Sequence, residues 1–564
     1  MRFDILFKPI VLAVMLSAAF ESQAYDFIED GIYYNIVDGG CEVTESQGTF
    51  FYSGDIVIPM VANGYTVVGI GDGAFAGCGG LKTLLMPPTL SYIGERAFAR
   101  CGLPSIEWPA GVSEISKGTF SGCYNLKSVT FSGRVREIGE SAFENCTALT
   151  SIELPESVTA IGERAFAGSG LTSIILPYRI LTISESTFAG CSDLSSVTFD
   201  GDLESVGYGA FKETDLVSVT LPETVVELGA RAFEGCSNLE TVEILGDNSV
   251  SFKYSYESYE SDHFYHGPFD SCSNLKTVKL PDGMEDICTG AFYGCSSLQS
   301  INMPANLQRI GDNAFEDCVS LPSAEFRSLQ DVGSRAFRGC SGLQWVKLPD
   351  CMHNVGESAF EDCSSLASIN LPDGIENIGF GAFAGSGLKS VKWPESMTEM
   401  SSDMFNGCTN LSSVTLGSKL NEISDGAFEG CPNIVEVNSL NPTPPEFYIG
   451  TYGFSGFEDE VYGNAVLRVP VGSRPAYFKA DCWINFDNIV ETDFGGVDDV
   501  AADGVSVTVS GGNIIVGGAG DGAAVDVYNI AGQRVYSGFG TTVGGLERGI
   551  YIVRVAGRTF KIAL

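Results

Sequence analysis

Residues 126–146 read LKSVTFSGRVREIGESAFENC, and this phrase decides the fold because it recurs along most of the chain. Its most constant residue is the phenylalanine of Ala142-Phe143, which recurs every 22 or 23 residues except for one interval of 36 residues. A fixed period of this length indicates an array in which each unit buries its apolar face against its neighbours. These phenylalanines are Phe75, Phe98, Phe120, Phe143, Phe166, Phe188, Phe211, Phe233, Phe269, Phe292, Phe315, Phe337, Phe360, Phe383, Phe405 and Phe428.

Each unit predicts one short strand followed by a return segment. Leu126, Val129 and Phe131 alternate with polar residues, so we expect them to face the core from one side of a strand. A proline such as Pro155 often follows and ends the strand, because it cannot donate a hydrogen bond. We then expect a tight or left-handed turn at Gly139 and a short helical turn at the Ala-Phe segment.

The recurring phrase resembles the BspA-like family of leucine-rich repeats, whose units read Leu-x-Ser-Val-x-Leu-Pro-x-x-Val-x-x-Ile-Gly-x-x-Ala-Phe-x-Gly-Cys. The resemblance covers 67–437 and implies an α/β repeat fold, a solenoid of short parallel strands and short helical turns with about 16 units. Segments 25–66 and 438–490 resemble the caps that close such arrays. Their apolar residues would cover the end units, which would otherwise expose a hydrophobic surface.

The two ends of the chain predict export. Residues 1–24 combine basic Arg2 and Lys8, an apolar run and small residues before a cleavage site, as in a secretory signal peptide. After an acidic, glycine-containing linker at 491–504, alternating apolar residues in 505–564 predict a small all-β sandwich. That segment resembles the sorting domain of type IX secretion cargo in Bacteroidetes-like bacteria. The resemblance implies the export machinery as a partner and a secreted or outer-surface location.

Composition excludes two classes of partner. The chain has 71 acidic and 32 basic side chains, a formal net charge of −39. So negative a field disfavours nucleic acid and anionic lipid surfaces. Beyond the signal peptide, we find no apolar run of the roughly 20 residues that a membrane span needs, so no membrane insertion is expected.

The cysteines predict core packing. Thirteen of the 17 lie three residues after a repeat phenylalanine, and Ser169, Thr214 and Ser386 take the same position in other units. A position that accepts serine or threonine favours a small buried thiol over a disulfide or metal ligand. We therefore expect no cofactor and no metal site.

The histidines do not indicate an enzyme. Only three histidines exist, and they suggest no catalytic triad, so the chain is interpreted as non-enzymatic. Asp262, His263 and His266 could hold a metal, but a polar surface loop is the favoured interpretation.

The outward face of the strands supplies the first candidate contact surface. If Val129 faces inward, then Ser128 and Thr130 face outward, and the Ser128 position holds serine or threonine in 14 of the 15 units from Thr83 to Ser413. The exception is a tryptophan, and basic residues gather nearby at the Thr130 position. An exposed tryptophan is typical of an interface anchor, although it could simply cover a loop. By contrast, Trp108 and Trp393 occupy inward positions and are expected in the core. The candidate residues are Trp345, Lys347, Lys392 and Lys279.

An insertion near 246–268 supplies the second candidate surface. It adds residues beyond the repeat period and is rich in tyrosine. Insertions in solenoids often form binding loops, and tyrosine gives contact area at low entropy cost. A disordered spacer is the alternative. The candidate tyrosines are Tyr254, Tyr256, Tyr259 and Tyr265.

Three functions remain open from the sequence. The first is adhesin-like recognition of a host or partner macromolecule, and the second is glycan binding by the exposed aromatic residues. The third is a structural surface-layer role without a specific ligand. The expected partner is accordingly an extracellular protein or a glycan.

Overall fold

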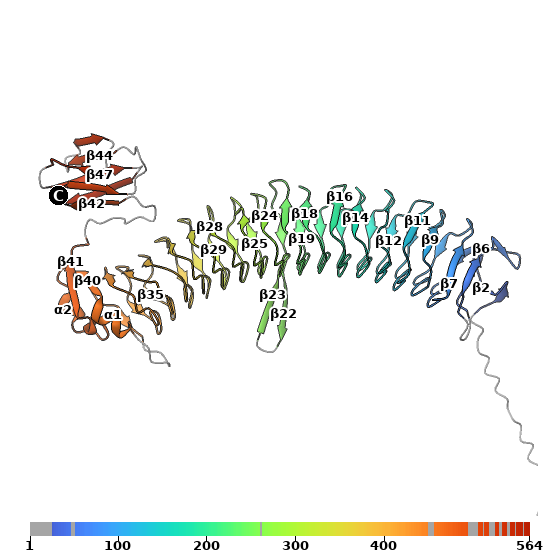
Figure 1. Ribbon diagram of the computed structural model, residues 1–564, viewed down its shortest axis with the longest axis horizontal. Coiled ribbons are helices and arrows are strands. Elements are labelled where there is room, and N and C mark those ends of the chain that lie inside the picture. The colour runs from blue at the N-terminus through green and yellow to red at the C-terminus, as the bar shows by residue number, and fades with distance from the viewer. Residues whose placement is uncertain are drawn as a thin grey trace, which may run out of the picture. The chain divides into compact units, whose positions relative to one another are not determined.

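The computed structural model describes residues 25–46, 51–259, 262–448 and 456–494, and seven segments near the C-terminus. Those segments are 506–510, 513–517, 525–529, 533–538, 542–546, 549–555 and 558–563. The expected signal peptide and most of the expected linker lie outside the described residues. Contacts divide the chain into two compact units, residues 1–170 and 171–564. Within each unit, successive turns of the repeat lie side by side (Figure 1).

The N-terminal unit begins with a β-rich cap. Its strands pair antiparallel except that β3 and β6 run parallel, and they are β1 (Phe27–Glu29), β2 (Ile32–Val37), β3 (Gly40–Val43), β5 (Val61–Ala62) and β6 (Tyr65–Ile70). The aromatic ring of Tyr52 lies 4.9 Å from that of Phe75, and its hydroxyl donates to the Thr44 carbonyl over 2.8 Å. The cap therefore covers the first repeat phenylalanine with another aromatic ring.

Turns of the repeat contribute one strand each to a first ladder, except the turn around Ser151, where residues 149–154 form no strand. In the N-terminal unit these strands are β4 (Gly54–Val57), β7 (Leu81–Leu85), β9 (Ser105–Trp108) and β11 (Ser128–Phe131). In the C-terminal unit they are β14 (Ser173–Leu176), β16 (Ser196–Phe199), β18 (Ser218–Leu221), β20 (Thr241–Ile244), β24 (Thr277–Lys279), β26 (Ser300–Ile301), β28 (Ser323–Glu325), β30 (Trp345–Lys347), β32 (Ser368–Ile369), β34 (Ser390–Lys392), β36 (Ser413–Leu416), β38 (Glu436–Ser439), β40 (Val466–Pro470) and β41 (Asn488–Thr492).

A second ladder of two-residue strands lines the return segment of each turn. In this ladder the residue at the Ile138 position pairs in parallel with its equivalent in the adjacent turn, as Ile115 pairs with Ile138. The strands are β8 (Tyr92–Ile93), β10 (Glu114–Ile115), β12 (Glu137–Ile138) and β13 (Ala160–Ile161), then β15 (Thr182–Ile183), β17 (Ser205–Val206), β19 (Glu227–Leu228), β21 (Ser251–Phe252), β25 (Asp286–Ile287), β27 (Arg309–Ile310), β29 (Asp331–Val332), β31 (Asn354–Val355), β33 (Asn377–Ile378), β35 (Glu399–Met400), β37 (Glu422–Ile423) and β39 (Glu446–Phe447). The chain is a repeat solenoid of parallel strands with about 19 turns.

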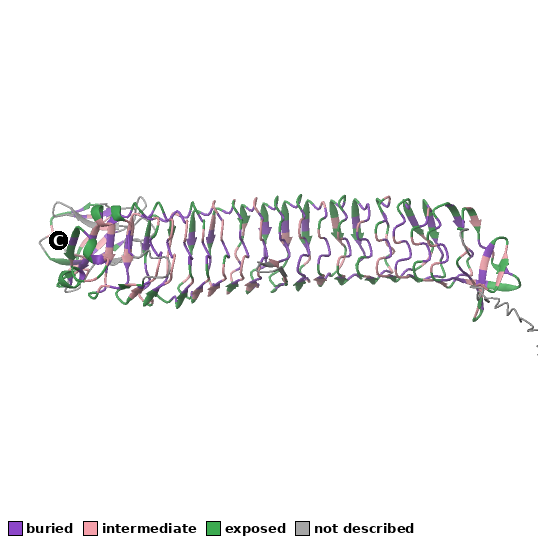
Figure 2. Cartoon of the chain, turned by 90° about the horizontal axis from the view of Figure 1, so that it is seen from below, coloured by how far each residue is buried: buried purple, intermediate pink, exposed green. Residues whose placement is uncertain are grey.

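The core recurs in the same form from turn to turn. The repeat phenylalanines are buried and stack with ring centroids close together, at 5.2 Å for Phe120 and Phe143 and 5.3 Å for Phe337 and Phe360. Figure 2 shows buried and exposed positions alternating alike in successive turns. Leu126 and Val129 are buried and Phe131 is partly buried, which confirms the predicted inward face of the strand.

The expected short helical turn at the Ala-Phe segment is wrong. Two residues of this segment, Ser141 and Asn145, have φ values of 54° and 58°, whereas a helix needs about −63° at every residue. The segment is instead a series of tight turns, and its backbone bonds to the adjacent turn of the solenoid. The Phe143 N–H, for example, donates to the Ala165 carbonyl over 2.7 Å.

Gly139 serves packing and not a left-handed turn, which corrects the expectation from the sequence. Its φ is not among the positive values of the chain. A Cβ at this position would lie 2.8 Å from the Lys117 nitrogen and 2.9 Å from the Ile115 oxygen. Glycine is therefore required because the backbone of the preceding turn approaches too closely for a side chain.

The far end of the array closes with aromatic side chains and short helices. Phe457 stacks on Phe428 at 4.8 Å, and the buried Trp483 donates its indole N–H to the Pro445 carbonyl over 2.7 Å. The helices are α1 (Asp459–Asn464), α2 (Arg474–Tyr477) and the 3-10 helix η1 (Trp483–Asn485). The first ladder continues through this cap, because β38, β40 and β41 pair in parallel, and β41 extends to Thr492, into the expected linker.

The C-terminal segment contains two antiparallel sheets. Their strands are β42 (Ser506–Ser510), β43 (Asn513–Gly517) and β46 (Thr542–Val543) in one, and β44 (Val525–Asn529), β45 (Arg534–Gly538), β47 (Ile550–Val555) and β48 (Arg558–Ala563) in the other. Buried side chains from both sheets form one hydrophobic cluster that includes Ile514, Val516, Val527 and Val553.

Candidate binding surface

Trp345 stands out at the outward position of the first ladder that Ser128 represents, where most described turns hold serine or threonine. This tryptophan lies on β30, where its neighbours in register are Ser323 and Ser368, and its side chain is 42% exposed. Trp108 and Trp393 are fully buried, which confirms that they belong to the core. Trp345 is thus a large exposed apolar side chain between two small polar ones.

Two of the candidate lysines, Lys347 and Lys279, are less available than the sequence indicates. Lys347 Nζ lies 2.8 Å from Glu325 Oε1, and Lys279 Nζ lies 2.6 Å from Glu243 Oε1. Each lysine therefore pairs with a carboxylate on the preceding turn, and the hydrogen bond to Glu243 raises the pKa of Lys279. Lys392 is exposed on β34, beside Thr415 in register.

The insertion forms a β-hairpin, which is the second candidate surface. Its strands β22 (Ser255–Tyr259) and β23 (Asp262–His266) pair antiparallel, with Tyr256 opposite Tyr265. Figure 1 shows this hairpin projecting from the turns of the repeat. It is shorter than the expected 246–268, because residues 251–252 already form β21 of the second ladder.

Three tyrosines form an aromatic cluster on the hairpin. The Tyr265 ring lies 5.4 Å from that of Tyr256 and 6.2 Å from that of Tyr254. Tyr254 and Tyr256 are 52% and 51% exposed. Tyr259 lies in β22, but its side chain is outside the described residues. The hairpin therefore presents aromatic surface to solvent.

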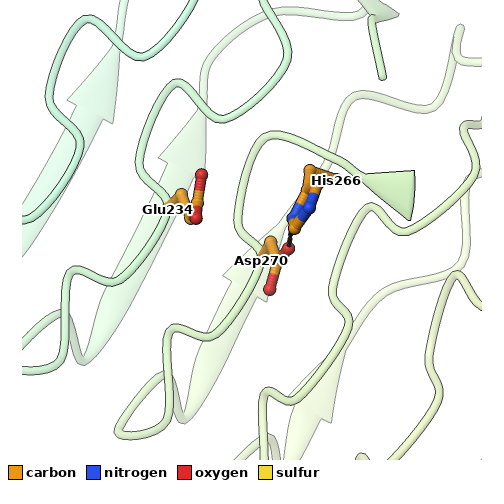
Figure 3. Close-up of side chains that lie close together, drawn as sticks. All are labelled: Glu234, His266 and Asp270. Atoms are coloured by element: carbon orange, nitrogen blue, oxygen red, sulfur yellow. Dashed lines mark hydrogen bonds and ion pairs between the residues drawn. The ribbon is translucent and has the colours of Figure 1, made fainter. Parts of the chain in front are cut away.

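Ion pairs tie the base of the hairpin to the array. Arg231 Nη2 lies 2.7 Å from Glu257 Oε1 on β22, and Arg231 Nε lies 3.3 Å from Glu234 Oε2. His266 ends β23, and its Nδ1 atom lies 2.5 Å from Asp270 Oδ2. Figure 3 shows His266 and Asp270 side by side, with Glu234 on the adjacent turn.

An open groove runs beside the base of the hairpin. One part, of about 520 Å³, is lined by Tyr254 together with residues of β21, β25, β27 and β29 and the turns that follow them. An adjoining part, of about 350 Å³, shares Asp286, Arg309 and Asp331 with the first and adds Gln308 and Gln330. A hollow of about 740 Å³ between α2 and β41 contains no residue of the hairpin.

The groove is lined by polar groups in fixed positions. Arg309 Nη2 lies 2.8 Å from Asp286 Oδ2, and Asp312 Oδ1 accepts the backbone N–H of Ser334 over 2.7 Å. Asp286, Arg309 and Asp331 are register partners on adjacent strands of the second ladder. The wall thus alternates in charge and is bordered by an exposed tyrosine.

Comparison with known families identifies the array. The BspA type leucine-rich repeat region matches residues 50–172, 115–240, 159–264, 262–350 and 330–457. The chain belongs to the BspA-type leucine-rich repeat family. In this BspA-type protein the matched region includes the hairpin, the groove and Trp345.

Solved structures resemble this BspA-type protein in part. A leucine-rich repeat protein from Bacteroides ovatus ATCC 8483 is 26% identical, with a TM-score of 0.44, over 73% of this chain and 94% of its own. A leucine-rich cell surface protein from Faecalibacterium prausnitzii A2-165 is 24% identical, with a TM-score of 0.36, over 73% and 94%. The pneumococcal vaccine antigen PcpA is 18% identical, with a TM-score of 0.33, over 83% and 98%. No curated protein matches the chain.

Burial makes Cys146 and Cys236 of this BspA-type protein unsuited to nucleophilic chemistry. Cys146 is fully buried and donates to the Phe120 carbonyl of the preceding turn. Burial raises the pKa of Cys146 to about 12 and that of Cys236 to about 11. The thirteen cysteines at the repeat position are buried, as the sequence predicts. Cys146 and Cys236 therefore serve packing, because their thiolate forms are disfavoured.

Sequence reasoning missed the groove and the cluster of Glu234, His266 and Asp270. The groove depends on which side chains of separate turns meet, and the second ladder was not expected. A signal for the cluster was present, since Glu234 and Asp270 both follow a repeat phenylalanine. That shared position places their carboxylates on adjacent turns.

Proposed function

We propose that the protein is a non-enzymatic recognition protein, and that it binds an extracellular macromolecule through the hairpin surface. The hairpin surface is defined as Tyr254, Tyr256 and Tyr265 together with the groove along β25, β27 and β29. One observation carries the proposal: a hairpin with half-exposed tyrosines interrupts an otherwise regular array beside an open polar groove.

The physical properties of the hairpin surface suit recognition. Tyrosine combines a large apolar ring with a hydroxyl and has few rotatable bonds, so it contributes contact area at a low entropy cost. The groove supplies hydrogen-bonding groups held by their own ion pairs, as between Arg309 and Asp286. An open groove suits an extended ligand better than a small molecule, which needs a concave site that surrounds most of it.

The preferred ligand is an extracellular protein. Interfaces between proteins are enriched in tyrosine and tryptophan, whereas the strong negative charge of the chain disfavours nucleic acid. Trp345 on the first ladder is the second candidate contact, but the pairing of Lys347 and Lys279 with glutamates makes it the less favoured surface. Lys392 would be the remaining basic contact of that surface.

A glycan is the alternative ligand, and the lining of the groove favours it specifically. Tyr254 borders a wall that also contains Gln308, Arg309 and Asp331. An aromatic ring can stack on the apolar face of a sugar, while carboxylate, amide and guanidinium groups can bond its hydroxyls. Both ligand classes would use the same surface.

We also propose that the protein acts outside the cell. The signal-peptide pattern in 1–24 and the likeness of 505–564 to a type IX sorting domain support export. The two sheets that share one hydrophobic cluster fit the sandwich that such a domain would form. In the part of the chain that the structure describes, no helix is long and apolar enough to cross a membrane.

The proposal is tested by screening the mature chain, residues 25–564, against arrays of extracellular matrix proteins and glycans. We expect saturable binding to at least one class of ligand, and the class distinguishes the preferred ligand from the alternative. Catalytic turnover of a bound glycan would contradict the non-enzymatic assignment. Background binding to every array would contradict the proposal and favour a structural surface-layer role.

A further inference from the structure

One repeat position carries a charge pattern that changes at the hairpin. It is the residue after each repeat phenylalanine, and successive turns place these side chains next to one another. At Glu316, Arg338 and Glu361 the signs alternate, and the guanidinium lies 3.2 Å and 3.1 Å from the two carboxylates. At Glu234 and Asp270 two carboxylates follow each other with no basic residue at this position between them.

His266 lies beside this pair of carboxylates. One ligand atom from each of Glu234, His266 and Asp270 falls within 4.8 Å of the others. The Asp270 side chain is only 4% exposed, and the buried Glu234 Oε2 has Arg231 Nε 3.3 Å away without a hydrogen bond between them. The three side chains come from two turns and from the end of β23 (Figure 3).

The surrounding ion pairs leave negative charge uncompensated. Lys212 and Arg231 are the cations paired in this network within the described part of the chain. They face the carboxylates of Glu213, Glu234 and Glu257, and Asp270 adds a fourth carboxylate that pairs with His266. The Glu213 and Glu257 side chains are 66% and 36% exposed and are therefore solvated, whereas the buried Asp270 has no lysine or arginine ion-pair partner among the described residues. Buried carboxylates need a compensating cation, because desolvation penalises an unpaired charge.

We propose that Glu234, His266 and Asp270 bind one divalent transition-metal ion of the zinc class. Zinc accepts imidazole nitrogen and carboxylate oxygen together, and three protein ligands leave a fourth position for water. The positive charge of the ion would compensate the buried Asp270 carboxylate, which has no lysine or arginine partner among the described residues. Imidazole favours zinc over calcium, which prefers oxygen ligands alone.

The bound ion would join the hairpin to two turns of the array. His266 ends β23, whereas Glu234 and Asp270 belong to adjacent turns, so the ion would fix the hairpin base more firmly than the Arg231 to Glu257 ion pair alone. Ligand atoms around tetrahedral zinc lie about 3.3 Å apart, as bond lengths near 2.0 Å require, so small side-chain movements suffice. The site stands independently of the proposed recognition function.

The test is zinc titration of the metal-depleted mature chain by isothermal calorimetry, with calcium as a parallel arm. We expect one zinc per chain and a higher unfolding temperature with zinc, because the ion binds the folded state alone. Glu234→Gln and His266→Gln keep similar shapes and should each weaken zinc binding by roughly tenfold or more. Circular dichroism without metal confirms that both variants fold.

Matched controls separate this site from other ligands. His353→Gln removes an exposed histidine, and Cys351→Ser removes the exposed cysteine, so neither should change zinc affinity. Zinc binding unchanged in folded His266→Gln, loss of binding in either control, or no binding at all would overturn the proposal. Tighter binding of calcium than of zinc would also overturn it.

Discussion

The repeat phenylalanines are the residues on which the stability of the array chiefly rests. Phe337 is fully buried, and its ring lies 5.1 Å from Phe315 and 5.3 Å from Phe360. In a solenoid each turn contacts only its neighbours, so a cavity here weakens two interfaces at once. We predict that Phe337→Ala lowers the free energy of unfolding by about 3–5 kcal/mol, measured by urea denaturation.

A matched surface substitution provides the control for this prediction. Phe380 also lies in the C-terminal unit and is 47% exposed. Phe380→Ala should therefore change the free energy of unfolding by no more than about 0.5 kcal/mol. Equal losses from the two substitutions would show that the buried stack is not the source of stability.

The buried thiols predict a dependence of stability on pH. Burial raises the pKa of Cys146 from 9.0 to about 12 in the folded chain. Because the folded pKa is the higher one, the stabilising contribution is complete below pH 9 and is lost as the pH rises from 9 toward 12. The unfolded chain then releases a proton that the folded chain retains.

A serine variant isolates this contribution. Serine occupies the same position at Ser169 and Ser386, so Cys146→Ser should fold. The free energy of unfolding of the wild type, relative to that of this variant, should fall by about 1.4 kcal/mol per pH unit above pH 9. Urea denaturation at each pH measures it. A constant difference between pH 8 and pH 11 would contradict the shifted pKa.

Residue positions within the strand could be predicted, but their partners could not. Alternation correctly placed Val129 inside and Ser128 outside, because the side-chain period of a strand is two. It could not show that Asn302 bonds the Leu280 backbone through both its side-chain oxygen and its side-chain nitrogen. Nor could it show that Lys347 pairs with Glu325, because each contact joins residues of separate turns.

At the scale of elements, the return segment differs most from the prediction. Two-residue strands are too short to show an alternating pattern, so the second ladder had no clear signal. The helical turn was expected from the compact Ala-Phe phrase. Glycines in the sequence argued against a helix here. In another unit Gly118 and Gly122 occupy the positions of Ser141 and Asn145, and both have a positive φ.

The hairpin should be removable without loss of the array. Deleting residues 254–265 joins Lys253 to His266 and leaves four residues between Phe252 and Phe269, the number between Ile138 and Phe143. We expect the deleted protein to keep its circular dichroism spectrum and its unfolding temperature within a few degrees. The reason is that β21 and the buried Phe252 remain in place.

A deletion that also removes β21 is the control for the hairpin deletion. Deleting 251–265 takes away the strand that pairs with β19 and the core residue Phe252, so we expect a clear loss of stability. If the deletion of 254–265 were equally destabilising, the hairpin would be part of the folded array and not an appendage to it.

At the scale of the whole molecule, the caps could be located but not their structure. Turn-like pairing extends beyond the recurring phrase, since β4 pairs with β7 before it and β40 with β41 after it. These strands are not accompanied by the Ala-Phe phrase from which the 16 units were counted. The ends of a solenoid must change sequence to cover its core, which is why the period alone underestimates the number of turns.

Export provides a prediction for the whole chain. Deletion of 505–564 should leave the repeats folded but prevent surface display in a host with type IX secretion, as measured by antibody labelling of intact cells. The deletion of 254–265 is the matched control and should be displayed normally. Equal display of both deleted proteins would contradict a sorting role for the C-terminal segment.

The central claim is that the hairpin surface recognises an extracellular ligand, and one affinity comparison tests it most directly. The dissociation constant of the ligand found by array screening is measured for the wild type, for the deletion of 254–265 and for Trp345→Ser, which matches the register neighbours Ser323 and Ser368. We predict that the deletion weakens binding at least tenfold, as expected when a cluster of anchor residues is lost. We also predict that Trp345→Ser changes it less than twofold. Unchanged affinity in the deleted protein would contradict the account.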